Sequence, residues 1–208
     1  MNTEIQAIQS YTNSIINIHP DLTQEELNFI VSKVTVTKLD NRKFYLNAGE
    51  IQPSMGFVYK GLLRSYYIDK GGKEITVSFI KENSYASEYS AFLTTKPSKF
   101  YIRSLEPCIF VNLPYLSMQE CYSKYKNFEK YGRLIAENIL VMRQNRIESF
   151  LFENAEQRYL NFIEKDAELL NRISLTHLSS FLGIERQSLT RIRKKLTENN
   201  FETNVSGK

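Results

Sequence analysis

The segment ISLTHLSSFLGIERQSLTRIRKKL, residues 173–196, decides the fold of the C-terminal part of this 208-residue chain. A helix-turn-helix needs apolar residues inside two short helices, a small residue where the helices cross, and a turn residue that tolerates positive φ. Gly183 meets the last requirement, and apolar residues recur at helical spacing on both sides of it. The framework residues that we assign are Leu178, Ser179, Gly183, Ile184, Leu189 and Ile192. The segment therefore predicts a helix-turn-helix.

The second helix of this motif is polar on the side opposite Leu189 and Ile192. The side chains on that side and at its flanks are Arg186, Gln187, Thr190, Arg191, Arg193, Lys194 and Lys195. An arginine can pair with the O6/N7 edge of guanine and a glutamine with the N6/N7 edge of adenine, while flanking basic side chains meet phosphates. We therefore expect this helix to bind double-stranded DNA, with a solvated basic surface helix as the alternative.

The net charge of +4 is concentrated in the same part of the chain. Residues 1–170 hold 20 basic and 20 acidic side chains, whereas residues 171–208 hold seven basic and three acidic ones. A basic excess on an otherwise neutral chain favours a polyanionic partner such as nucleic acid.

The middle of the chain, from about residue 33 to 115, has the pattern of an antiparallel sheet. Short apolar segments alternate with turn residues, and the pair Gly71-Gly72 supplies the positive φ that a hairpin needs. From residue 75 to 79 apolar and polar residues alternate, as in a strand with one buried face. Because no helical crossover separates the segments, we expect a β-roll or barrel. A short helix that begins with a capping box is expected before it, over residues 22–32.

Residues 117–151 contain no proline and a single glycine, and they predict one long helix. A helix of this length is usually stabilised by a partner helix alongside it. The residues that we assign to such a seam are Tyr131, Leu134, Ile135, Asn138, Val141, Met142 and Asn145. We expect a homodimer, and the alternative is a helix that packs only on its own roll. The chain then divides into residues 1–152 and residues 153–208, the latter with an amphipathic helix over 155–170 and the helix-turn-helix.

Metal, cofactor and catalytic signatures are scarce. Two cysteines and two histidines cannot supply a disulfide framework, a four-thiolate zinc site or an all-cysteine iron–sulfur cluster. The sequence has no phosphate-binding loop and no nucleophile elbow, so we expect no enzyme, no metal and no cofactor. No apolar run reaches the ~18 residues of a membrane span, and the first residues lack the pattern of a signal peptide. We therefore expect a cytoplasmic protein with no membrane contact.

These features together resemble the cyclic-AMP receptor/Fnr family of bacterial transcription regulators, over nearly the whole chain. Residues 58–61, 72–75 and 83–88 are similar to the cyclic-nucleotide-binding-like sensor of that family. The long helix is similar to its dimerisation helix, and the helix-turn-helix matches in register. The resemblance implies an α+β fold with an N-terminal antiparallel β-roll, a central dimerisation helix and a C-terminal helix-turn-helix domain. It also implies sequence-specific regulation of transcription by a homodimer on double-stranded DNA, with RNA polymerase as a candidate partner.

The resemblance places Arg186, Gln187 and Arg191 at the three main base-reading positions. The family often has a glutamate where Gln187 stands. Because glutamate accepts a hydrogen bond from cytosine N4 whereas glutamine pairs with adenine, we expect a different half-site preference here. Family members usually continue into a β-hairpin wing, and only residues 199–208 follow the recognition helix in this sequence. We therefore expect a truncated or absent wing.

The sensor departs from the nucleotide-binding members of the family. In those members a Gly-Glu pair is followed further along by an arginine that neutralises the cyclic phosphate. The corresponding pairs here are Ser87-Glu88 and Ser98-Lys99, so that arginine is missing. Without the charge-assisted contact a buried phosphate binds weakly, and we expect no response to cyclic AMP. A pocket for an unknown small effector would be lined by Ser87, Glu88, Ser98, Lys99, Val141 and Met142.

A second interpretation is a sensor module that binds a small molecule or a protein without specific DNA binding. Its basic C-terminal segment would then be incidental. The two interpretations differ in their salt dependence, because DNA binding weakens steeply as the salt concentration rises.

Overall fold

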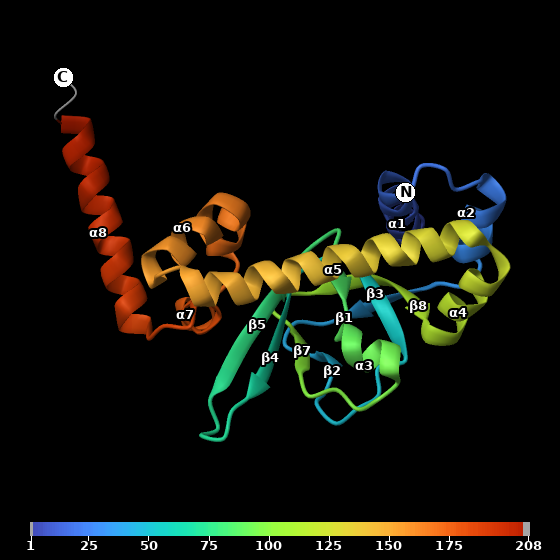
Figure 1. The fold of residues 1–208 in the computed structure, drawn as a ribbon, viewed down its shortest axis with the longest axis horizontal. Helices are drawn as coiled ribbons and strands as arrows, with labels where there is room; N and C mark the ends of the chain where they lie inside the picture. The colour runs from blue at the N-terminus through green and yellow to red at the C-terminus, as the bar shows by residue number, and fades with distance from the viewer. Residues whose placement is uncertain (1, 206–208) are drawn as a thin grey trace.

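The structure is a computed structural model that describes residues 2–205 (Figure 1). The N-terminal helices are α1 (Thr3–Ile18) and α2 (Gln24–Val31). The strands are β1 (Thr35–Leu39), β2 (Phe44–Leu46), β3 (Ser54–Lys60), β4 (Leu63–Ile68), β5 (Glu74–Ile80), β6 (Tyr85–Ala86), β7 (Tyr101–Ser104) and β8 (Cys108–Pro114), with helix α3 (Tyr89–Thr94) between β6 and β7. The remaining helices are α4 (Tyr115–Lys124), α5 (Lys126–Phe152), α6 (Ala155–Asp166), the 3₁₀-helix η1 (Ala167–Asn171), α7 (Leu175–Leu182) and α8 (Arg186–Val205). None of the helices within residues 2–205 combines the length and the apolar character that a membrane-spanning segment requires.

The strands form two four-stranded antiparallel sheets, in the orders β1-β8-β3-β6 and β2-β7-β4-β5. The β4–β5 hairpin turns at Gly72, whose φ is 81°, and the Asp69 carboxylate accepts hydrogen bonds from the N–H groups of Gly71 and Lys73. The buried apolar residues between the sheets are Leu46, Val58, Leu63, Ile80, Ala86, Ile102, Cys108 and Phe110. The predicted antiparallel roll and its hairpin are confirmed.

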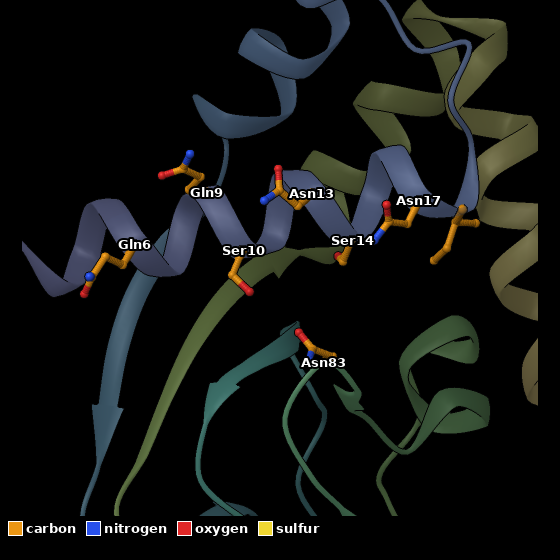
Figure 2. A pocket seen from close by; sticks show the side chains of 8 residues that line it. Gln6, Gln9, Ser10, Asn13, Ser14, Asn17 and Asn83 are labelled. Atoms are coloured by element: carbon orange, nitrogen blue, oxygen red, sulfur yellow. The ribbon is translucent and has the colours of Figure 1, made fainter.

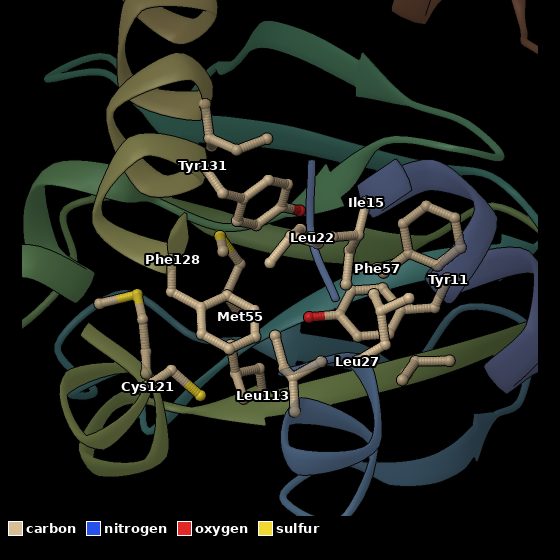
Figure 3. Packing of buried hydrophobic residues seen from close by; sticks show 14 of the residues in the cluster. Tyr11, Ile15, Leu22, Leu27, Met55, Phe57, Leu113, Cys121, Phe128 and Tyr131 are labelled. Atoms are coloured by element: carbon tan, nitrogen blue, oxygen red, sulfur yellow. The ribbon is translucent and has the colours of Figure 1, made fainter. Parts of the chain in front are cut away.

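Helices α1, α2, α4 and α5 cover the outer face of the sheet that contains β3 and β8 (Figure 3). In the cluster beneath them the ring of Tyr11 lies 5.5 Å from that of Phe57, measured between centroids. Phe128 and Tyr131 of α5 are buried in the same cluster, and the hydroxyls of Tyr131 and Tyr85 are 2.5 Å apart. The first third of α5 is therefore fixed to the roll by a large apolar contact.

Of the two N-terminal helices, α2 was predicted from the sequence and α1 was not. No element was assigned to residues 3–18, where α1 forms with Ala7, Tyr11 and Ile15 on its buried face. The predicted helix over residues 22–32 is confirmed as α2, together with its capping box. Thr23 Oγ1 accepts from the N–H of Glu26, and the Glu26 carboxylate accepts from the N–H of Thr23 (2.7 Å).

The prediction of one helix over residues 117–151 is wrong, because Tyr125 separates α4 from α5. Tyr125 has extended backbone angles, with φ −136° and ψ 122°. Its ring packs edge-on against Phe29 of α2 (5.4 Å between centroids), and its hydroxyl donates to Glu25 (2.8 Å). These contacts to a distant helix stabilise the break. Neither proline nor glycine marks the break in the sequence.

The C-terminal helices share a core with the roll. Helix α5 ends at Phe152, Glu153 is extended, and Asn154 caps α6, so residues 152–154 form a short connection, called the hinge below, between α5 and α6. The helix predicted over residues 155–170 changes at Asp166 into η1. The core residues are Leu62 from the roll with Tyr159, Phe162, Leu169, Leu178, Leu182 and Leu189 from the C-terminal helices. The helix-turn-helix is therefore docked on the roll in this structure, and the domain boundary at residue 153 stays a prediction.

Candidate nucleic-acid interface

The turn between α7 and α8 is built around Gly183. Its φ of 68° and ψ of 35° lie in the left-handed region, where a residue with a Cβ atom is strained. Ser174 caps the start of α7 by accepting a hydrogen bond from the N–H of His177 (3.1 Å). The buried framework residues are Leu178, Ser179, Leu182 and Leu189, with Ile184 and Ile192 half-buried. The structure thus has the helix-turn-helix geometry that the sequence predicts.

The outward side of α8 is open. Figure 1 shows α8 projecting away from the roll. Two lysines of the set are paired with carboxylates: Lys194 with Glu198 of the same helix (3.6 Å) and Lys195 with Glu156 of α6 (2.9 Å). Lys195 therefore lies toward α6, and its charge is partly neutralised. The exposed residues of the predicted DNA-binding set are Arg186, Gln187, Thr190, Arg191, Arg193, Lys194 and Lys195.

Helix α8 is longer than expected. The recognition helix was expected to end before residue 199, whereas α8 runs from Arg186 to Val205. No proline or glycine occurs between residues 184 and 206, so nothing in the sequence stops the helix earlier. The predicted wing region begins inside α8, which includes residues 199–205, and residues 206–208 lie outside the described residues.

Helix α7 closes the outer edge of strand β5, which stands at the end of its sheet. The hydroxyl of Ser180 accepts from the N–H of Thr76 (2.9 Å) and donates to the carbonyl of Glu74 (3.1 Å). The ring of Phe181 lies 5.3 Å from that of Phe79, measured between centroids. An edge strand exposes unpaired backbone groups, and here a side chain of the helix-turn-helix satisfies two of them. The sequence alone offers no signal for this pairing.

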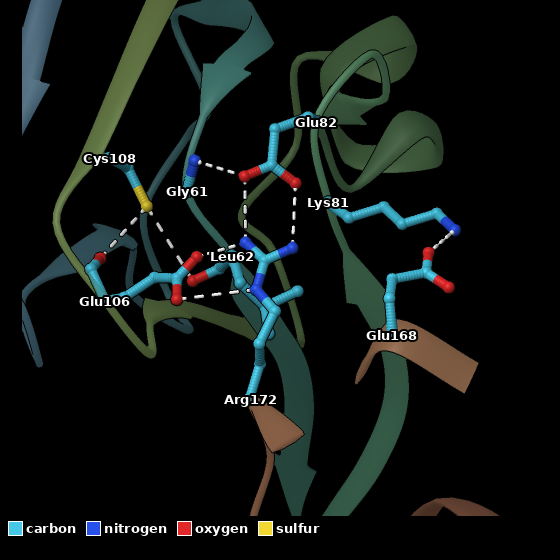
Figure 4. A network of polar contacts seen from close by, with 8 residues as sticks. All are labelled: Gly61, Leu62, Lys81, Glu82, Glu106, Cys108, Glu168 and Arg172. Carbon is cyan, nitrogen blue, oxygen red and sulfur yellow. Dashed lines mark hydrogen bonds and ion pairs between the residues drawn. The ribbon is translucent and has the colours of Figure 1, made fainter. Parts of the chain in front are cut away.

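An ionic network also joins the roll to Arg172, which precedes α7 (Figure 4). Arg172 donates to both oxygens of Glu82, at 2.8 and 3.0 Å, and to Glu106. Burial alone would raise the pKa of Glu82, but hydrogen bonds from Arg172 and from the N–H of Gly61 leave it below its ordinary value. The thiol of Cys108 lies beside this network, and burial raises its pKa to about 12, which leaves it unreactive at neutral pH.

Gln52 occupies the position of the predicted effector pocket. The residue is 2% exposed. Its Oε1 accepts from the N–H of Glu88 (2.9 Å) and from the hydroxyl of Ser87 (3.4 Å). Its Nε2 donates to the carbonyls of Ser54 (2.7 Å) and Ala86 (3.3 Å). The amide is fully used within the chain, and sequence reasoning missed it because an isolated glutamine has no distinctive pattern.

The other predicted pocket residues have different environments. The Glu88 carboxylate caps α3 by accepting from the N–H of Ala91 (2.6 Å). The Ser98 hydroxyl bonds to the backbone of Phe100, and Lys99 is exposed. Val141 and Met142 are 57% and 63% exposed on α5, beyond the turns that pack on the roll. Contrary to the prediction, Val141 and Met142 lie in solvent in this chain and do not complete a pocket with the other predicted residues.

A polar groove lies elsewhere, between α1 and the turn at Asn83 (Figure 2). Its volume is about 640 Å³. The lining residues are Gln6, Gln9, Ser10, Asn13, Ser14, Asn17, Ile18 and Asn83. The groove contains none of the predicted pocket residues. Its lining is uncharged, so it offers no cation to neutralise a phosphate.

Helix α5 has one face on the roll and one face in solvent. Tyr131 and Ile135 are each 6% exposed and pack on the roll, so their assignment to a dimer seam is wrong. They follow the same apolar spacing as seam residues, which sequence alone does not separate. Leu134 is half-buried, while Asn138, Val141 and Asn145 are exposed along one side of the helix. The exposed apolar residues of this helix are Leu140, Val141, Met142, Ile147, Phe150, Leu151 and Phe152.

Residues 37–125 match the family model of the cyclic nucleotide-binding domain. No curated protein sequence is significantly similar to the chain. Among solved structures, FixK2 from Bradyrhizobium japonicum is similar with a TM-score of 0.69 at 14% identity, over 80% of this chain and 86% of that chain. The Catabolite Activator Protein of Thermus thermophilus is similar with a TM-score of 0.56 at 16% identity, over 90% of this chain and 88% of that chain.

The c-di-GMP responsive global regulator CLP of Xanthomonas campestris is similar with a TM-score of 0.64 at 14% identity, over 86% of this chain and 93% of that chain. These three structures belong to regulators of the cyclic-AMP receptor/Fnr family. The matches confirm the resemblance seen in the sequence. Residues 37–125 thus match the cyclic nucleotide-binding domain family, and the chain has the fold that the cyclic-AMP receptor/Fnr regulators share.

Proposed function

We propose that this chain is a homodimeric, sequence-specific DNA-binding transcription regulator of the cyclic-AMP receptor/Fnr family. The observation that carries the proposal is the two-sided character of α8. Arg186, Gln187 and Arg191 are exposed, whereas Leu189 is 0% exposed on the opposite side. Because the buried side fixes the helix, the polar side is presented as one rigid surface.

The chemistry of that surface suits the major groove. Each arginine can donate two hydrogen bonds to the O6 and N7 atoms of a guanine, and Gln187 can pair with the N6 and N7 atoms of an adenine. Arg193 and Lys194 add positive charge at the flanks, which supplies affinity for phosphates without sequence preference. The expected half-site therefore contains guanines and an adenine.

The exposed side of α5 supports the homodimer. Leu134 and Val141 alternate there with Asn138 and Asn145, which stand seven residues apart. Polar residues at a repeated seam position fix the register of two parallel helices at some cost in stability. Two copies paired in this way would place their recognition helices in successive major grooves, with half-sites ~34 Å apart.

Lack of response to cyclic AMP belongs to the same proposal. The region of the sensor that resembles the phosphate cassette holds the buried amide of Gln52 and the hydroxyl of Ser98, and the nearby cation, Lys99, is exposed. A cyclic phosphate there would lose charge-assisted hydrogen bonds and would break the bonds that Gln52 makes.

Selection of bound sequences from a random pool of duplex DNA tests the proposal. We expect an enriched two-fold symmetric site whose affinity falls log-linearly with salt and is unchanged by added cyclic AMP. Arg191→Ala should cost about 1–3 kcal/mol on the best site and relax the preference at one base pair. No enriched sequence, or equal binding by wild type and Arg191→Ala, would contradict the DNA-binding assignment. A gain in affinity with cyclic AMP would contradict the effector assignment alone.

A further inference from the structure

The last turn of α7 leaves four carbonyl oxygens without donors inside the helix. Two of them are satisfied locally. The N–H of Gly183 donates to Ser180 O (3.2 Å), and the N–H of Ile184 donates to Ser179 O (3.0 Å). The remaining two belong to Phe181 and Leu182, next to the turn that leads into the recognition helix.

Two arginines from other helices satisfy these remaining carbonyls. Arg146 of α5 donates through Nη2 to the carbonyl of Phe181. Arg158 of α6 donates through Nε to the carbonyl of Leu182 (3.0 Å). A cation at a helix C-terminus is also favoured by the helix dipole. All four terminal carbonyls of α7 therefore have partners, and half of those partners come from outside the helix-turn-helix.

The guanidinium of Arg146 is held between two aromatic rings. Its Cζ atom lies 4.3 Å from the ring centroid of Phe150 and 3.9 Å from that of Phe181. Burial lowers the pKa of Arg146 to about 10, and the positive charge of Arg158 contributes to the shift. Arg146 therefore remains charged at neutral pH, in a slot whose walls come from α5 and α7.

Phe150 and Arg158 complete the contact between α5 and the turn. A Cβ atom on Gly183 would come within 2.6 Å of Phe150 Cε1, so the turn lies directly on this ring. Arg158 donates a second hydrogen bond, to the carbonyl of Glu153 in the hinge (2.5 Å). Its Cζ atom lies 5.0 Å from the ring centroid of Phe150. One small cluster thus connects the end of α5, the hinge and the helix-turn-helix turn.

We propose that Arg146 and Arg158 are positioning residues that fix the recognition helix relative to the dimerisation helix. The inference rests on the proposed DNA-binding function and adds the residues that set the geometry of the dimer on DNA. The exposed seam of α5 ends at Asn145, and the contact with the turn begins at the next residue. Because a helix is stiff over this length, the dimer seam determines where each turn lies. The two arginines then fix the orientation of each recognition helix together with the contacts that dock α7 on the roll.

The first test measures the geometry without DNA. Spin labels on Gln144→Cys and Thr197→Cys report the distance between α5 and α8, because both positions are exposed whereas Cys108 and Cys121 are 1% exposed. Labelled chains are diluted with unlabelled ones so that each dimer carries one labelled copy. We expect one narrow distance distribution in the wild type and a broadened one in Arg146→Met and in Arg158→Met. The control is Arg143→Met, an exposed arginine one turn earlier on α5.

The conservative variant Arg146→Lys separates positioning from folding. Lysine keeps the charge but lacks the planar guanidinium group. We therefore expect a folded protein whose distance distribution is intermediate in width between those of wild type and Arg146→Met. The difference in distribution width between wild type and Arg143→Met defines the experimental scatter. If the distance distributions of Arg146→Met and Arg146→Lys both stay within that scatter of the wild-type width, the proposal is overturned. A circular-dichroism melt of each variant shows that the broadening is not unfolding.

The second test measures half-site spacing on DNA. We expect the wild type to lose about tenfold or more in affinity when one base pair is inserted between the half-sites of its selected site, since the insertion rotates one half-site against the other. Arg146→Met should bind an isolated half-site with the same affinity as the wild type. Its affinity for the full site should fall much less than that of the wild type when the base pair is inserted. An unchanged penalty would overturn the positioning role. If the wild type selects no DNA, the proposed function fails, while the distance measurement still decides whether the arginines fix α8.

Discussion

The guanidinium of Arg172 forms two hydrogen bonds to the carboxylate of Glu82, of 2.8 and 3.0 Å, and thereby joins the segment before the helix-turn-helix to the turn after β5. Glu106 accepts a third hydrogen bond from the same guanidinium. Lys81 adds a second ionic contact, to Asp166 at 2.6 Å. The docked arrangement of the C-terminal helices thus depends on a few charged residues in addition to the apolar core.

Replacement of Arg172 by methionine should destabilise the protein by about 1–2 kcal/mol, because two partly buried carboxylates then face each other without a cation. The side chains of Arg172 and Glu82 are 25% and 33% exposed, so solvent reduces the effect below that of a fully buried pair. Urea unfolding at neutral pH measures the change. Lys96→Met, at an exposed position, is the control and should leave the stability unchanged. Equal stabilities of Arg172→Met and wild type would show that the network contributes nothing.

The pH dependence of stability should also involve Glu82. Its pKa in the folded state lies below the ordinary value of 4.5, so the folded form binds a proton less readily than the unfolded chain. The stabilising contribution is therefore complete above that ordinary value and is lost as the pH falls through the folded pKa. Glu82→Gln removes the titration but keeps an oxygen for the N–H of Gly61. We expect the stability difference between wild type and Glu82→Gln to shrink from neutral pH to about pH 3.5, measured by urea unfolding at each pH. A constant difference would assign the effect to packing instead.

Gln187 should determine one base of the half-site. In Gln187→Glu the carboxylate accepts from cytosine N4 and no longer pairs with adenine, so the preference at that position should change by about 1–3 kcal/mol. Competition binding with the four base pairs at this position measures the change. Because Gln187 is exposed, the melting temperature should not change, which serves as the folding control. An unchanged base preference would show that Gln187 does not contact the base.

The sequence predicted the helix-turn-helix well because its requirements are local: a glycine at the turn, apolar residues at helical spacing and a polar outer side. The roll followed from turn residues and alternation in the same way. The predictions of secondary structure fail where contacts between residues far apart in the sequence determine the local backbone. Tyr125 interrupts the predicted long helix, and its side chain packs against Phe29 and donates to Glu25 of the distant helix α2.

The candidate site shows the same division. The exposed face of α8 could be predicted from residue type and period, whereas the residues that hold the turn could not. Arg146 is a basic residue on a helix and has the sequence appearance of a surface residue, yet its partner is a carbonyl 35 residues away. Gln52 carried no signal either, because its four hydrogen bonds come from loops and strands that are separate in the sequence.

A charge placed on the exposed seam of α5 should leave the fold of the monomer intact but weaken the dimer. Val141 is 57% exposed, so Val141→Glu should fold normally while the dimer weakens, since the charge would be buried against the second copy. Sedimentation over a range of concentrations measures the oligomeric state. Leu140→Glu is the matched control, because Leu140 is 68% exposed and one residue round the helix from the seam. Dissociation by Leu140→Glu but not by Val141→Glu would place the seam on another side of α5.

Gly183 should be sensitive to substitution for two separable reasons. Its φ of 68° strains any residue with a Cβ atom, and the added atom would come within 2.6 Å of Phe150 Cε1. Arg146 and Arg158 lie against the Phe150 ring, so a shift of the ring away from the added atom would disturb these two contacts. We expect Gly183→Ala to destabilise the protein by at least about 1–2 kcal/mol, from the left-handed backbone alone. Gly183→Asn carries the same Cβ atom but tolerates the left-handed region better, so urea unfolding should find it more stable than Gly183→Ala, unless contact with Phe150 dominates. Equal stabilities of the two variants, both well below wild type, would therefore assign the cost to the Phe150 contact, and wild-type stability in both would contradict the turn geometry.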